Sequence, residues 1–157
     1  MTSILDHPSI GGRYLFPQDR TLQRPFVARV NNIELACFHR IVDESGFTLI
    51  HFHGNGEAVA DYVPHMADVF EDIGLNQLFV EYREYGGSSG EAKLVAMLAD
   101  GESVMQAAGI DPKKAVVHKF SNKMDGQDRQ DDFNSQTNSL VSCESFGFEF
   151  RISKVDP

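Results

Sequence analysis

Cysteine is scarce in this sequence, with Cys37 and Cys143 far apart and outside any CxxC pattern. This spacing indicates neither a disulfide framework nor a zinc site, so a reduced, cytoplasmic setting fits best. No apolar run approaches the roughly 20 residues that a membrane-spanning helix needs. The first residues, MTSILDHPSIGG, lack the basic and then apolar segments of a secretory signal. We therefore expect a soluble, unprocessed protein.

Positive charge is also in short supply. Lys and Arg number 14 against 23 Asp and Glu, which gives a formal net charge of -9. Nucleic-acid phosphates and anionic membrane surfaces would repel such a protein, so neither is expected as a partner. With 157 residues and 41% apolar content, the chain is long and apolar enough for about one globular domain.

The most informative stretch is 47–57, FTLIHFHGNGE, a continuous apolar run that stops at His53 and the loop GNGE. Such a run predicts a buried central strand that ends in a tight loop. Apolar residues then recur at three- and four-residue spacing, which predicts a helix from about Ala58 to Ile73, closed by Gly74. Strand, loop and helix without a linker are typical of the start of a βαβ unit.

The rest of the first 118 residues extends this pattern. Residues 1–25 are rich in Gly, Pro and polar groups and predict an irregular lead-in, packed by Tyr14, Leu15 and Phe16. The remaining elements are predicted at 26–30 and 33–41 (a hairpin with an Asn-Asn turn), 75–82 (strand), 94–108 (helix) and 115–118 (strand). The fold class is therefore α/β, with an antiparallel hairpin followed by parallel βαβ units and helices on both faces.

The character of the chain changes at Lys119. The run KMDGQDRQDDFNSQTNS is polar and acidic without either period, so 121–157 is interpreted as a divergent tail, largely loop or disorder. Within it, three Phe and one Ile alternate with polar residues or Gly, which predicts a strand at 146–152. This strand would either cover the edge of the strand at 115–118 or be non-native. An uncovered apolar edge would favour self-association.

The glycine-containing loop suggests three interpretations. As a phosphate cradle it is disfavoured, because GxGxxG fails at Val59 and no GK[ST] follows. As an oxyanion hole, an N–H after the His-Gly pair would stabilise the charge that develops on an acyl oxygen. In the third interpretation, the glycines merely allow a sharp turn.

Three segments in order, HFHGNGEAVADY, LFVEYREYGGSSGE and GIDPKKAVVH, resemble the N-terminal half of the α/β-hydrolase family, and within it bacterial serine hydrolases with an HGN oxyanion loop. The resemblance covers about residues 26–118 and defines a partial hydrolase domain at 26–120. It implies that Asn55, with the neighbouring Gly56, supplies an oxyanion-hole N–H, and that His53 and Gly54 shape the loop. The implied substrate is a small ester or related acyl compound, with no cofactor and no metal.

In this family, the strand that 115–118 resembles leads into a GxSxG nucleophile elbow. Ser121 falls on the nucleophile position, but Lys119 and Lys123 occupy the two glycine positions. The family's triad order is Ser, acid, His, and all six histidines of this chain precede Ser121. The acidic residues that follow it belong to a polar run that is typical of a solvated segment: Asp125, Asp128, Asp131 and Asp132.

Three explanations remain open at this point. The reading frame is shifted or truncated near codon 119; or the chain is a non-catalytic α/β module that binds a small acyl or anionic ligand at the Asn55 loop; or it is half of a split enzyme. The sequence predicts serine-type ester hydrolysis for the intact family and an inactive chain on its own, because removal of the base from a Ser-His pair costs several orders of magnitude in rate.

Overall fold

The structure is a computed structural model, and it describes residues 14–119. The regular elements, in chain order, are β1 (Phe26–Val30), β2 (Ile33–Arg40), β3 (Thr48–Phe52), the 3-10 turn η2 (Val59–Asp61), α2 (His65–Asp72), β4 (Asn76–Val80), α3 (Leu94–Ala107), the 3-10 turn η3 (Pro112–Lys114) and β5 (Ala115–Lys119).

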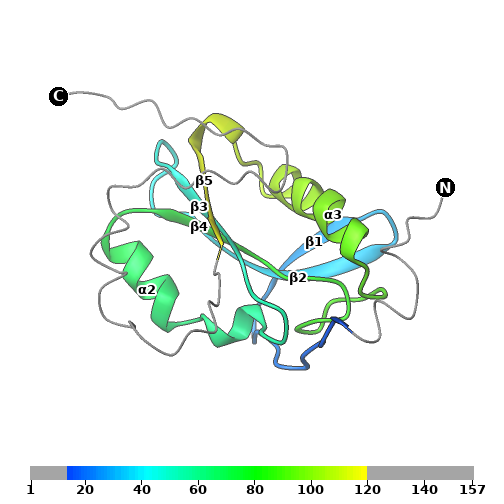
Figure 1. Ribbon diagram of the computed structural model, residues 1–157. Helices are drawn as coiled ribbons and strands as arrows, with labels where there is room; N and C mark the ends of the chain where they lie inside the picture. Colours follow the sequence, from blue (N-terminus) through cyan, green and yellow to red (C-terminus); the bar gives the residue numbers. More distant parts are fainter. Residues whose placement is uncertain (1–13, 120–157) are drawn as a thin grey trace. The chain divides into compact units, whose positions relative to one another are not determined.

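The five strands form one mixed sheet in the order β1-β2-β4-β3-β5 (Figure 1). The hairpin β1–β2 is antiparallel and joins β4 antiparallel, while β4, β3 and β5 run parallel to one another. The predicted fold class, an antiparallel hairpin followed by parallel βαβ units, is confirmed. In the hairpin turn, Asn31 adopts a φ of +55°, a left-handed conformation that Asn tolerates well.

The predicted helix at 58–73 is wrong in its first half. Residues Val59–Asp61 form only a 3-10 turn, and α2 begins at His65. The cause is Pro64, which has no N–H to donate and whose ring clashes with the preceding helical turn, so a helix cannot run through it. The apolar periodicity continues across this break and conceals it. The predicted end holds within one residue: α2 stops at Asp72, and Gly74 takes a φ of +77°.

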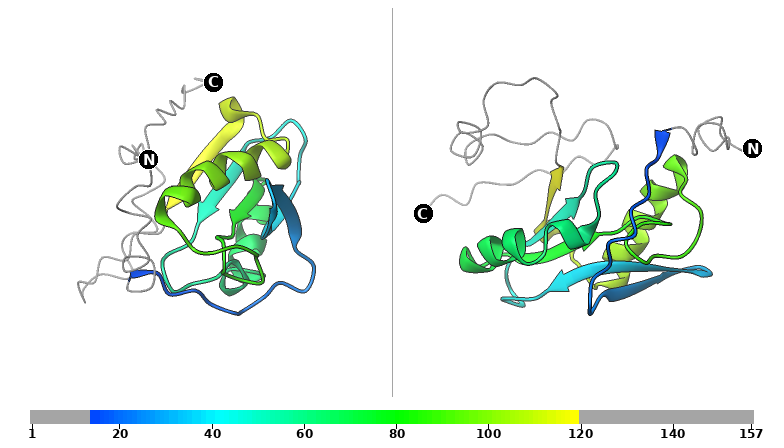
Figure 2. Two further views of the ribbon diagram at one scale, coloured as in Figure 1. Left: turned by 90° about the vertical axis from the view of Figure 1, so that its right-hand side faces the viewer. Right: turned by 90° about the horizontal axis from the view of Figure 1, so that it is seen from below.

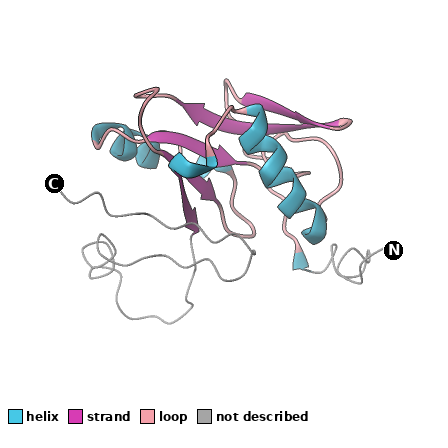
Figure 3. Cartoon of the chain, turned by 90° about the horizontal axis from the view of Figure 1, so that it is seen from above, coloured by secondary structure: helices cyan, strands magenta, loops and turns pink. Residues whose placement is uncertain are grey.

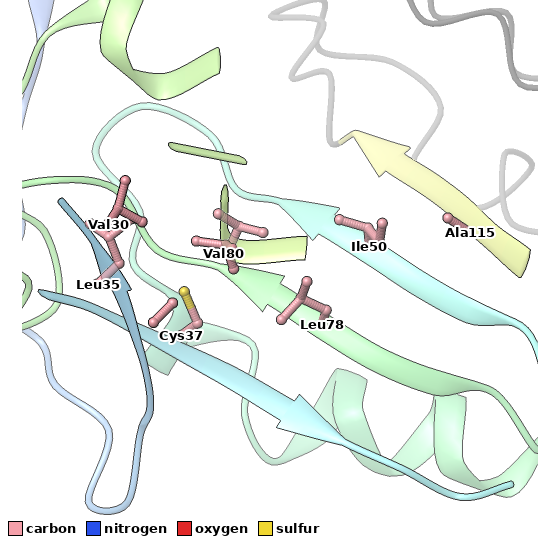
Figure 4. Close-up of a cluster of buried hydrophobic side chains, with 9 residues drawn as sticks. Val30, Leu35, Cys37, Ile50, Leu78, Val80 and Ala115 are labelled. Atoms are coloured by element: carbon pink, nitrogen blue, oxygen red, sulfur yellow. The ribbon is translucent and has the colours of Figure 1, made fainter. Parts of the chain in front are cut away.

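Helices α2 and α3 lie on opposite faces of the sheet (Figure 3). On the α3 side, apolar residues of all five strands meet Val104 of α3, and several of them are labelled in Figure 4. On the α2 side, Leu49 and Phe79 of neighbouring strands pack against Ala67. Because β3 and β4 are covered on both faces, every residue in them is buried except Phe52, which is half-buried. The buried positions include four polar residues beside the apolar ones: Thr48, His51, Asn76 and Gln77.

The sheet has two outer strands, β1 and β5. Among residues 14–119, β5 pairs only with β3, so no described strand covers its other side. The predicted strand at 146–152 and the tail at 121–157 lie outside the described residues. Of the predicted lead-in, the part from Tyr14 onward is described, and Leu15 packs against Tyr85 and Ala92 in a third apolar cluster.

Candidate active site

The candidate site lies at the carboxyl ends of β3 and β4. These strands are parallel and in register, with Phe52 opposite Val80, so the next residue of each strand, His53 and Glu81, lie side by side. His53 Nε2 is 2.6 Å from Glu81 Oε1, and both side chains are almost fully buried. The edge of the sheet where the candidate loop starts is therefore closed by a buried histidine–carboxylate pair.

Both nitrogens of the His53 ring are engaged. Nδ1 is 2.9 Å from the Gly54 carbonyl oxygen, which can only accept, so Nδ1 carries a proton and donates it. Glu81 also accepts from the backbone N–H groups of Val59 (2.9 Å) and Tyr82 (3.1 Å). Since Nε2 is held by Glu81, this ring has no nitrogen left to act as a general base towards a substrate. It fixes the start of the loop instead.

The loop itself is closed by Glu57. Its Oε2 accepts from the Gly54 N–H at 2.6 Å and from the Tyr62 hydroxyl, and the Glu57 N–H donates to the Gly54 carbonyl at 3.2 Å. A Cβ at Gly54 would lie 2.7 Å from Glu57 Oε2. Glycine is therefore needed at position 54 for the carboxylate to approach, and the loop carries its own internal brace.

Asn55 uses its side chain to hold the lead-in. Its Oδ1 accepts from the Phe16 N–H at 2.9 Å, and its Nδ2 donates to the Tyr14 carbonyl at 2.5 Å. The amide thus pairs with alternate backbone groups of the lead-in as a neighbouring strand would. The Tyr85 hydroxyl donates to the same Oδ1 at 2.8 Å and accepts from the Phe16 N–H at 3.1 Å. Burial raises the pKa of Tyr85, so this hydroxyl stays protonated and able to donate.

The two N–H groups expected to form an oxyanion hole differ in their surroundings. The Gly56 N–H faces the Tyr85 hydroxyl oxygen. The Asn55 N–H has no hydrogen-bond partner within residues 14–119, and Asn55 is exposed. Gly56 has a φ of +83°, the left-handed conformation that glycine adopts at no steric cost. Of the two groups, the Asn55 N–H is therefore the one that can donate a hydrogen bond to a substrate oxygen.

A second contact attaches the lead-in further along. Arg20 forms a two-pronged ion pair with Asp61, with N–O distances of 2.5 and 2.6 Å, and its Nη2 lies 3.4 Å from the Gly56 carbonyl. The Gln18 carbonyl accepts from the Gly86 N–H at 2.8 Å. Residues 14–20, which we call the strap, therefore bridge the loop after β3 and the loop after β4. Figure 2 shows this segment in dark blue.

The loop after β4 is anchored by a partly buried ion pair. Arg83 contacts Asp100 of α3 through two N–O pairs at 2.6 and 2.8 Å, and Asp100 is 3% exposed. Glu84 has a φ of +68°, a left-handed conformation that strains most residues with a Cβ. Here the Glu84 carboxylate accepts from the Ala92 N–H at 3.1 Å.

A pair of histidines, one on β3 and one on β5, lies within the sheet. His51 and His118 face each other in the β3–β5 register, with their Nδ1 atoms 3.1 Å apart. His51 is fully buried and packs against Tyr62 and Phe79. Its Nε2 has no hydrogen-bond partner among residues 14–119. Burial, reinforced by the neighbouring His118 and His53, lowers the pKa of His51 to about 3. This pair is part of the packed interior.

The other predicted site residues divide between those described and those outside the described part. His53, Gly54, Asn55 and Gly56 come together in one loop, as given above. Ser121, Cys143 and the acidic run lie outside the described residues. Cys37 is a buried free thiol, and burial raises its pKa to about 12. No helix in the described part is long and apolar enough to cross a membrane. Nor does any group of three metal-ligating side chains occur within residues 14–119.

Sequence reasoning missed several contributors to this site, among them Arg20, Asp61, Glu81 and Tyr85. A signal existed for Glu81 alone, because a charged residue directly after an apolar strand, next to a strand that ends in His, has to be satisfied at that sheet edge. The others make contacts across at least 30 residues of sequence, and no local pattern marks them.

Comparison with solved structures identifies the fold. The predicted CIB-like hydrolase of Thermoplasma acidophilum matches with a TM-score of 0.53 and 17% identity, over 62% of this chain and 50% of that one. An alpha-beta hydrolase from Vibrio vulnificus matches with a TM-score of 0.50 and 19% identity, over 60% of this chain and 34% of that one. No family model matches the sequence.

This part of the chain therefore has the α/β-hydrolase fold. The sequence resemblance to that fold is confirmed with partial coverage. The chain spans about half the length of the Thermoplasma hydrolase and about a third of the Vibrio one.

Proposed function

We propose that this fold serves serine-type hydrolysis of an ester or related acyl substrate in the intact protein, with the Asn55 N–H as a donor to the developing oxyanion. One observation carries the proposal. The Asn55 N–H has no partner among the described residues, while the side chain of the same residue is fixed by three hydrogen bonds. A donor held in place before the substrate arrives is what oxyanion stabilisation requires.

The topology supports the same reaction class. Strands β3 and β5 are parallel neighbours, with Phe52 opposite Lys119, so both end at the same edge of the sheet. Ser121, the proposed position of the nucleophile, follows two residues after β5 and lies outside the described residues. His53 is assigned to loop shaping, since both of its ring nitrogens are engaged.

The chain by itself is proposed to be inactive. No histidine follows Ser121 in this sequence, and His51 and His53 are buried in contacts of their own. Purified protein mixed with p-nitrophenyl acetate should show no burst of p-nitrophenol, and mass spectrometry should find no acyl group on Ser121. The variant Ser121→Ala is the control. A stoichiometric acyl-enzyme at Ser121 in the wild type would overturn the inactive assignment.

A frame change near codon 119 is testable on the coding DNA. Translation after codon 118 in all three frames should give GxSxG, followed by Asp and His, in a shifted frame. If no frame contains that pattern, the tail is genuine and the two alternatives take over. A non-catalytic binding module predicts a folded monomer, and a split enzyme predicts a neighbouring gene that supplies the base.

A further inference from the structure

The strap places an aromatic side chain directly beside the candidate oxyanion donor. A Cβ on Gly56 would lie 3.8 Å from the Cβ of Phe16, so the Phe16 side chain starts beside the position that a side chain at Gly56 would occupy. The remainder of the side chain is not packed away, since Phe16 is 56% exposed. Its backbone is held at the same time, because the Phe16 N–H is shared between Asn55 Oδ1 and the Tyr85 hydroxyl.

This position is fixed from both ends of the strap. Before Phe16, the Tyr14 carbonyl accepts from Asn55; after it, the Gln18 carbonyl accepts from Gly86, and Arg20 binds Asp61. Leu15, the residue between the two exposed aromatic side chains of the strap, points into the apolar cluster with Tyr85. A segment tied at so many points presents Phe16 at a constant place, which lowers the entropic cost of binding a ligand against it.

We propose that Phe16 is a specificity-determining residue that contacts the acyl chain of the substrate, and that Asn55 is the positioning residue that holds it there. The inference rests on the proposed function, because it requires an acyl oxygen at the Asn55 N–H. With that oxygen at Asn55, an acyl chain that extends over Gly56 meets the exposed ring of Phe16. The substrate class is thereby narrowed to esters of apolar acyl chains longer than acetyl.

The test uses carboxylates as probes, because they carry the acyl oxygens without needing a nucleophile. The full-length chain, labelled with nitrogen-15, is titrated with acetate and with octanoate below its micellar concentration, at about 0.15 M salt to screen the negative net charge. Amide shifts of Asn55, Gly56 and Phe16 report binding at the loop. Octanoate should bind at least tenfold more tightly than acetate, since each fully buried methylene contributes about a fourfold gain.

Two phenylalanine variants test whether octanoate binds at Phe16 or at any exposed apolar side chain. Phe16→Ala should reduce the octanoate-to-acetate affinity ratio to near one. Phe47→Ala is the matched control: Phe47 is 48% exposed and precedes β3, at the opposite end of the strand, so the ratio should stay at its wild-type value. Asn55→Ala removes both side-chain hydrogen bonds from Asn55 to the strap but retains the backbone N–H, so it should also lower the ratio. Asn55→Asp still accepts from the Phe16 N–H and should restore part of the ratio.

The outcomes distinguish the two proposals. If acetate and octanoate shift the Asn55 amide with equal affinity, or if Phe16→Ala leaves the ratio unchanged, the acyl-chain contact is overturned while the oxyanion donor stands. If neither carboxylate shifts the amides of residues 54–57, both the donor and the contact that depends on it are refuted.

Discussion

Acidification should destabilise this protein through His51. The folded environment lowers the pKa of His51 to about 3, whereas an unfolded histidine titrates near 6.5. The folded state therefore binds fewer protons than the unfolded state below pH 6.5. Stability from this group is fully present above that pH and is lost as the pH falls from 6.5 towards 3. His118 has its pKa lowered by burial as well and acts in the same direction.

The expected size follows from the linkage relation. Between pH 7 and pH 5, His51 alone should remove about 2 kcal/mol from the free energy of unfolding, at ~1.4 kcal/mol for each pH unit below 6.5. The hydrogen bond between His51 and His118 also predicts lower stability at low pH. The two Nδ1 atoms are 3.1 Å apart, so one must donate and the other accept, and protonation of both rings would set two N–H groups against each other.

Urea unfolding followed by circular dichroism at pH 7, 6 and 5 measures the effect. The variant His51→Phe, which replaces the imidazole by an apolar ring among Tyr62 and Phe79, should lose about 2 kcal/mol less than the wild type over this range. The exposed His65→Gln is the matched control for loss of a histidine. Equal pH dependence in the wild type and His51→Phe would refute the reasoning, as would an NMR titration of His51 in the folded protein with a midpoint near 6.5.

Two further substitutions, each with a matched partner, test the sheet edge by urea unfolding. Gly86→Ala should lower the free energy of unfolding by at least about 3 kcal/mol, because Gly86 has a φ of +56° and a Cβ there would lie 2.7 Å from the carboxyl carbon of Glu81. Gly74→Ala, at a φ of +77° with open space around it, should lower it by only about 1 kcal/mol. Equal losses in the two variants would contradict the steric clash at Gly86. Glu81→Ala should lower the free energy of unfolding by about 3–5 kcal/mol, because it leaves the buried His53 without its carboxylate partner. Glu34→Ala, at the exposed ion pair with Arg29, should change it little. A small loss for Glu81→Ala would mean that water replaces the carboxylate at His53.

Strand positions were predictable because parallel strands covered on both faces have mostly apolar sequences. β3 and β4 each have three apolar residues of five, and their observed bounds fall within the predicted ones. The loop after β3 was predictable because glycine and asparagine end the apolar stretch abruptly. The break at Pro64 was equally visible as a residue, but the apolar spacing on either side of it matched one uninterrupted helix.

The role of the Asn55 side chain was not predictable from local sequence. Its two partners on the strap are 39 and 41 residues away, and the Tyr85 hydroxyl is 30 residues away. A loop motif identifies the backbone N–H, whereas side-chain pairing depends on where a distant, irregular segment crosses the sheet edge. The His53–Glu81 pair lies between these cases, because it requires only the parallel register of two neighbouring strands.

The donor side of the candidate site therefore depends on a tertiary clamp rather than on the loop motif alone. The strap, the loop after β3 and the loop after β4 are tied together by Asn55, Tyr85 and the buried His53–Glu81 pair, all of them within residues 14–119. Because none of these contacts uses a residue beyond 119, the oxyanion donor can be tested apart from the nucleophile. A carboxylate bound at Asn55 in a chain that forms no acyl-enzyme would show that the two halves of the reaction are separable here.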